Sequence, residues 1–190
     1  GIAARQVYTP RWAHCDDNHA WVEVFVDGEW HFLGACEPEE VLDTGWFSGP
    51  ANRAILIHTR NFSDYVKESN EEYLGKEGAL YYFNHTDFYG RTKLVKILVK
   101  DENGKPAAGA HIAVEILNMA EFFPAAVMIA DADGEVRMTL GLGDIRVRAF
   151  DGIRRAEAMM RIEEEDSLEL VLREEAVPEA DDRWQTLEIR

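Results

Sequence analysis

Residues 19–33 carry the strongest strand pattern in the chain. The run at 19–26 (HAWVEVFV) is rich in β-branched and aromatic residues and has apolar side chains at both parities. This composition predicts a strand buried on both faces. Asp27-Gly28 separates it from a second apolar run at 29–33 (EWHFL). Asp-Gly between two such runs indicates a two-residue hairpin, because a type I′ turn needs positive φ at both central residues.

A two-residue turn also fixes which residues of the hairpin face each other. Phe25 is expected opposite Trp30, and further along His19 is expected opposite Cys36. Directly opposed residues share a face of the sheet. The hairpin is therefore expected to bring one histidine and one thiol together at its open end, with His31 on the other face.

From about residue 79 the pattern changes to short segments that alternate between apolar and polar residues. Residues 93–100 (KLVKILVK), 111–116 (HIAVEI) and 145–149 (IRVRA) each have one apolar and one wet face, and turn-forming runs lie at 102–106 and 131–134. Period-2 segments at regular spacing are typical of two packed antiparallel sheets. We expect a β-sandwich here.

The chain is expected to divide into three parts. Residues 61–78 are polar and read as a loop or short surface helix, which makes them the expected boundary region. We place a first domain at 1–74, a second at 75–173 and an acidic tail at 174–190.

Composition and net charge limit the kinds of molecule that this chain is expected to bind. With 190 residues and 46% hydrophobic residues, the chain can bury a sizeable core. Its formal net charge of -16 repels phosphate backbones and anionic lipid, so neither nucleic acid nor a membrane is an expected partner. No apolar run approaches the roughly 20 residues that span a bilayer. The first residue is Gly1 rather than Met, so we expect a piece of a longer protein.

Two cysteines are too few for a disulfide framework, although Cys15 and Cys36 could form one bridge. Both read as small buried residues, with Cys36 as a less favoured thiol partner for His19. A transition-metal site is not expected, because no paired Cys-x-x-Cys is present. We expect no metal and no cofactor. The residues weighed for a metal site were His14, Cys15, Asp16, Asp17, His19, His31 and Cys36.

The first sixty residues resemble the transglutaminase-like superfamily, and most closely its bacterial members. The resemblance is carried by Trp12, the run 16–21 (DDNHAW), the hairpin residues 27–30 (DGEW), the run 34–38 (GACEP) and 45–47 (GWF). It implies a mainly β chain from an α+β parent: the distal sheet of a papain-like core. Members of this family are cysteine hydrolases, proteases or acyltransferases that act on peptide or protein amides.

The resemblance assigns the catalytic histidine to His19, which would serve a cysteine thiolate as general acid and base. The family's nucleophile opens a helix that ends before the position of Gly1, so neither Cys15 nor Cys36 matches it. We therefore expect the nucleophile on a preceding segment of the same protein, and this chain to be inactive alone.

The resemblance also guides the choice of the acid that orients the histidine. The family's Asp-Pro pair has a displaced counterpart here in Glu37-Pro38, so Glu37 is the expected acid. A bulge at Gly34 would turn its side chain to the face of His19. Asp16, Asp17 and Asn18 are the alternatives. Trp12 and Asp17 are the expected substrate-binding residues, whereas the other tryptophans read as core.

Residues 92–173 resemble the prealbumin-like sandwiches known as carboxypeptidase regulatory-like domains. The carrying residues are the turns at 99–106 and 131–135 and the run 143–147. Such modules act as spacers, supports or adhesion elements, and their fold is silent on function. This leaves a non-catalytic binding or structural module as the alternative to an enzyme. An extracellular or cell-envelope location is favoured.

Overall fold

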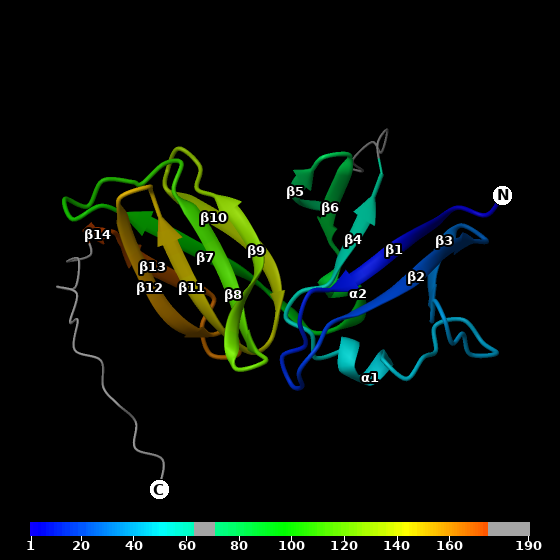
Figure 1. Ribbon diagram of the computed structural model, residues 1–190. Helices are drawn as coiled ribbons and strands as arrows, with labels where there is room; N and C mark the ends of the chain where they lie inside the picture. Colours follow the sequence, from blue (N-terminus) through cyan, green and yellow to red (C-terminus); the bar gives the residue numbers. More distant parts are fainter. Residues whose placement is uncertain (63–70, 175–190) are drawn as a thin grey trace, which may run out of the picture.

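The computed structural model describes residues 1–62 and 71–174. Within them the chain is mainly β, as predicted, and forms a six-stranded sheet followed by a two-layered sandwich (Figure 1). Of the acidic tail expected at 174–190, only Glu174 is described, and residues 175–190 lie outside the described residues. No helix of the described residues is long and apolar enough to cross a membrane.

The first sheet is antiparallel throughout, in the order β3-β2-β1-β4-β6-β5. A short helix, α1, covers one face of this sheet, and a second short helix, α2, follows β6 in the chain (Figure 1). The bounds are β1 Ala4–Thr9, β2 His19–Val26, β3 Glu29–Leu33, α1 Ser48–Ala51, β4 His58–Asn61, β5 Glu72–Glu77, β6 Leu80–Asn84 and α2 Thr86–Tyr89.

The β2–β3 hairpin has the register that its turn predicts. Asp27 and Gly28 have φ of 52° and 93°, and Phe25 pairs with Trp30. However, β3 ends at Leu33, so the predicted pairing of His19 with Cys36 does not form. The chain folds back at Gly34, where a Cβ would lie 2.5 Å from the carbonyl oxygen of Glu37. This reversal takes the place of the predicted bulge.

Only one face of β2 carries fully buried side chains, which corrects the prediction of a strand buried on both faces. Trp21 and Glu23 are completely inaccessible, whereas Val22 and Val24 on the opposite face are half-buried. The covered face packs against α1 and the segments beside it. Its core consists of Val7, Trp12, Trp21, Phe47, Ala51, Ala54 and Ile57.

The polar stretch after β4 is not simply a loop or surface helix. Residues 72–77 form β5, which pairs with β6, and β6 in turn pairs with β4. Periodicity missed β5 because Gly75 interrupts the alternation at a register shift. The first sheet thus extends to Asn84, past the boundary expected at residue 74, and the second unit begins with β7.

The second unit contains a three-stranded sheet, β10-β7-β13, and a five-stranded sheet, β14-β12-β11-β8-β9. The predicted strands at 93–100, 111–116 and 145–149 correspond to β7, β8 and β11. All strand pairs are antiparallel except β13 with β7. The bounds are β7 Thr92–Lys100, β8 His111–Asn118, β9 Glu121–Ile129, β10 Glu135–Gly141, β11 Asp144–Phe150, β12 Arg154–Arg161, β13 Ser167–Val171 and β14 Arg173–Glu174.

The sandwich core is built from the alternate apolar residues of both sheets, and it also takes in two residues from the first unit. Ile97, Ile112 and Val147 illustrate the predicted alternation, each with no exposed surface. Ile55 and Leu56, which precede β4, are equally buried and belong to the same apolar cluster. The two units therefore share a core.

Candidate functional site around His19

His19, the first residue of β2, lies half-buried among four aromatic rings. Its ring centroid is 4.6 Å from that of Trp46, which it meets edge-on, and 5.1 Å from that of Phe47. Trp21 and Trp12 stack at 5.8 and 6.2 Å. The sequence explains Trp21, because residues two apart on a strand share a face. Trp46 and Phe47 come from the loop that follows β3.

Glu37 lies on the same side of the sheet as His19 but does not bond to it. The indole N–H of Trp46 donates to Glu37 Oε1 at 3.0 Å, and the same indole touches the His19 ring. Trp46 thus stands between the expected acid and the expected base. No hydrogen bond joins Glu37 to His19 among the described residues.

The surroundings of His19 act on its charge in opposite directions. Burial among the rings lowers the pKa of His19, and this effect is the largest. The carboxylates of Glu37 and Asp17 raise it, but by less. The imidazole is therefore neutral at pH 7, with negative charge close enough to stabilise an imidazolium when one forms.

The loop between β1 and β2 holds the other expected residues. The backbone N–H of Trp12 donates to the backbone carbonyl of Asp17 at 3.0 Å, which closes the loop. Asp17 Oδ1 accepts the N–H of Asn18, and Asp16 Oδ1 accepts the N–H of Met119 from the sandwich. The side chains of Asp16 and Asp17 thus accept hydrogen bonds from backbone N–H groups, and Asp17 acts on His19 through its charge.

Trp21 is buried in the core as expected, but Trp12 and Trp46 do not occupy the places expected for them. Trp12, expected to line an open groove, is only 2% exposed, because the loop folds its ring against His19. Trp46, expected in the core, is 55% exposed. The indole available at the surface beside His19 is therefore that of Trp46. A role for Trp12 or Asp17 in binding substrate stays a prediction.

Beneath His19 lies a buried polar network that the sequence analysis did not identify. Glu23 has no exposed surface, and its Oε2 pairs with Arg5 Nε at 2.7 Å. Its Oε1 accepts the hydroxyl of Tyr89 and lies 3.1 Å from His85 Nε2. The Tyr89 hydroxyl in turn accepts the N–H of Trp21 at 2.8 Å. This chain of bonds fixes the indole on which His19 stacks.

The two cysteines lie at the surface. Both Cys15 and Cys36 are exposed free thiols, which excludes the disulfide considered from the sequence and corrects their expected burial. His31 lies on the opposite face of the hairpin, where its Nδ1 is 2.7 Å from Asp43 Oδ2. Within residues 1–62 and 71–174, no three histidine, cysteine or acidic side chains gather as metal ligands would.

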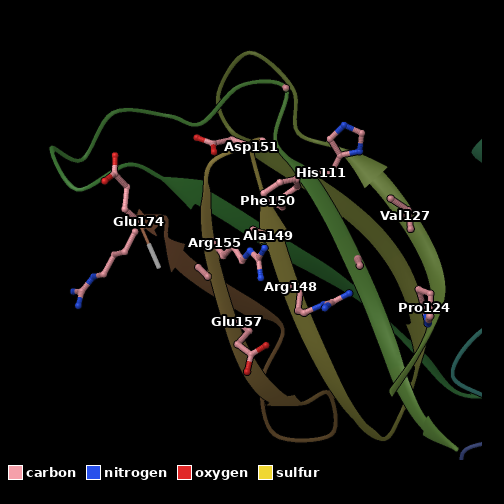
Figure 2. Close-up of a pocket in the computed structure, with 15 residues that line it drawn as sticks. His111, Pro124, Val127, Arg148, Ala149, Phe150, Asp151, Arg155, Glu157 and Glu174 are labelled. Carbon is pink, nitrogen blue, oxygen red and sulfur yellow. The ribbon is translucent and has the colours of Figure 1, made fainter. Parts of the chain in front are cut away.

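A hollow of about 950 Å³ lies on the outer face of the five-stranded sheet of the sandwich (Figure 2). Its cations face acids of similar number, and Arg148 is already paired with the buried Glu115 at 2.8 Å. Arg154, nearby, pairs with Asp151 of the rim. None of the lining residues belongs to the sheet that carries His19.

Comparisons with known proteins leave the family open. No family model matches the sequence, and no curated protein matches it. Among solved structures, the chain is similar to a streptococcal ancillary pilin, with 10% sequence identity and a TM-score of 0.34. The match covers 90% of this chain and 61% of the pilin chain, so this chain spans less than two thirds of that length.

Proposed function

We propose that the first unit is the histidine–acid part of a transglutaminase-like cysteine hydrolase that acts on peptide or protein amides. The observation that carries the proposal is the surroundings of His19: a half-buried imidazole, kept neutral by aromatic rings, with Glu37 one indole away. A neutral imidazole near a carboxylate is what a general base for a thiol requires. The family resemblance supplies the reaction.

In this proposal His19 carries one proton in each half of the cycle. It takes the proton of a cysteine thiol, and the thiolate attacks the amide carbonyl carbon. The imidazolium returns the proton to the leaving amine as the C–N bond breaks, which leaves a thioester. Water then attacks the thioester carbonyl carbon and loses a proton to His19. The imidazolium passes that proton to the departing thiolate as the C–S bond breaks, which releases the acid and restores the thiol. With an amine in place of water, the same steps transfer the acyl group.

Glu37 and Trp46 have distinct parts in this scheme. The Glu37 carboxylate stabilises the imidazolium that forms twice in each cycle, as its effect on the pKa of His19 indicates. Trp46 holds Glu37 through its N–H and shields one edge of His19 from water. We propose hydrolysis rather than cross-linking, because the bacterial members that the sequence resembles are chiefly hydrolases.

A thiol outside residues 1–190 completes this site in the proposal, since neither Cys15 nor Cys36 matches the position of the family's nucleophile. The same observation favours the second candidate, a non-catalytic binding module derived from the family. The reading frame before Gly1 discriminates between them. A cysteine opening an amphipathic helix there supports the enzyme, because a helix N-terminus lowers a thiol pKa.

The direct test is alkylation of the intact protein by iodoacetamide at pH 6, followed by mass spectrometry. The enzyme proposal predicts one cysteine that reacts at least tenfold faster than Cys15 and Cys36, and that His19→Gln slows. His31→Gln is the matched control, because it changes a histidine of the same hairpin on the opposite face. Alkylation confined to Cys15 and Cys36, at rates unaffected by His19→Gln, would contradict the enzyme and favour the binding module.

A further inference from the structure

The sandwich reaches into the His19 site through the tip of one hairpin. Asn118, the last residue of β8, is 3% exposed and makes three hydrogen bonds to the loop between β1 and β2. Its Nδ2 donates to the carbonyls of Trp12 and Cys15 at 2.9 and 2.8 Å. Its Oδ1 accepts the N–H of Asp17 at 3.1 Å. One side chain thus holds both ends of the loop.

The backbone of the hairpin tip adds a fourth bond and is itself unusual. The N–H of Met119 donates to Asp16 Oδ1 at 2.7 Å. Met119 and Ala120 both have positive φ, 54° and 59°, although neither is glycine. Side-chain-bearing residues in that region are strained and persist only where the surrounding structure holds them. Here the hydrogen bonds to the loop between β1 and β2 hold the tip in this strained conformation.

The loop that Asn118 holds is the one that surrounds His19. Trp12 stacks on the His19 ring. Asp17 lies two residues before His19 and has a φ of 99°. A small change in the loop would therefore shift both Trp12 and Asp17 relative to the imidazole. Arg11, at the start of the loop, lies 3.9 Å over the Phe123 ring of β9. The loop is therefore fixed from the sandwich side as well as by the packing of Trp12 in the core of its own sheet.

We propose that Asn118 is a positioning residue for His19: the sandwich holds the loop that places Trp12 and Asp17 against the imidazole. The appended sandwich is then part of the site and not only a spacer. The role of His19 in catalysis rests on the proposed function, but its placement by Asn118 does not.

The test is a proton NMR titration of His19 in the intact protein and in Asn118→Ala. Loosening the loop exposes the imidazole, so its pKa rises toward the ordinary value and its ring-proton shifts change as Trp12 moves. Met119→Ala is the matched control, because it removes an exposed side chain and keeps the N–H that bonds Asp16. In the control, His19 titrates as in the wild type.

Asn118→Asp keeps the inference testable if the alanine variant does not fold. It preserves size and an oxygen for the Asp17 N–H, but it sets a carboxylate oxygen against the carbonyls of Trp12 and Cys15. Because the added charge raises the pKa of His19 by itself, the readout for this variant is the ring-proton shifts, which change as Trp12 moves. We expect kcat for casein hydrolysis to fall about tenfold or more, with KM little altered. A folded variant in which His19 keeps its wild-type titration and shifts would overturn the inference. A changed titration, with hydrolysis unaffected by His19→Gln, would overturn the proposed function alone.

Discussion

At the scale of single residues, the most perturbed histidine is not the expected catalytic one. His58 in β4 is 6% exposed and packs between Tyr8 and Tyr82, with ring centroids at 5.5 and 5.3 Å. Burial, reinforced by the charge of Arg60, lowers the pKa of His58 to about 4. The folded protein therefore holds this imidazole neutral where an unfolded chain would protonate it.

This depressed pKa predicts a loss of stability in mild acid. Because the unfolded chain binds the proton first, the contribution of His58 falls as the pH drops from about 6.5 to about 4, by about 3 kcal/mol. His58→Phe removes the titration, so its free energy of unfolding in urea is expected to depend less on pH between 7 and 4. His111→Gln, at an exposed position, serves as the control. An unchanged pH dependence in His58→Phe would contradict the assignment.

At the scale of elements, the turns of the two hairpins that build the site differ in chemistry. The β2–β3 turn has Asp27-Gly28, the residue types that its positive φ values favour. The β8–β9 turn has Met119-Ala120 in similar conformations, at a cost of about 1 kcal/mol for each residue. The second hairpin is therefore held by its contacts rather than by its own sequence.

Ala120→Gly is expected to stabilise the protein by about 1 kcal/mol, because glycine adopts the left-handed conformation without steric cost. The same change at Ala113, within β8, is expected to destabilise it by a similar amount, since glycine weakens a strand interior. Urea denaturation of the two variants measures both signs. Destabilisation by Ala120→Gly would show that the tip is not strained.

The two turns also show how far the sequence could predict the site. Asp27-Gly28 fixed the hairpin register, and alternation identified the face shared by His19 and Trp21, because both signals are local. Trp46, Tyr89 and Asn118 reach the site through loops or from the other unit, and no periodicity records such contacts. The sequence contains one sign of the buried polar network: Glu23 is a charged residue on the face of β2 that also carries the apolar Trp21.

At the scale of the whole molecule, the two units are joined by buried groups. Ile55 and Leu56 lie within the sandwich core, and the Gly141 N–H donates to the Ile55 carbonyl at 2.8 Å. Asn84 Nδ2 donates to the Thr139 carbonyl. We therefore expect the first sheet and the sandwich to unfold as one cooperative unit.

Gly141 is the point where this joint is closest. A Cβ at this position would lie 1.9 Å from the carbonyl oxygen of Ala54, so Gly141→Ala must push the units apart. We expect a loss of roughly 1–3 kcal/mol, typical of overpacking, and a single thermal transition at a lower Tm. Gly49→Ala in α1 meets no atom within 4 Å and is the control. If only part of the protein were destabilised and two transitions appeared, the shared core would not couple the units.

The catalytic role of His19 is tested by kcat/KM for hydrolysis of fluorescein-labelled casein by the full-length protein, including its nucleophile, and by the His19→Gln variant of that protein. The account predicts a loss of about 10²–10⁴-fold, as for removal of a general acid and base, with the fold retained by circular dichroism. His31→Gln, beside a carboxylate on the opposite face, should retain wild-type activity. Hydrolysis by the intact protein that survives His19→Gln unchanged would contradict the account.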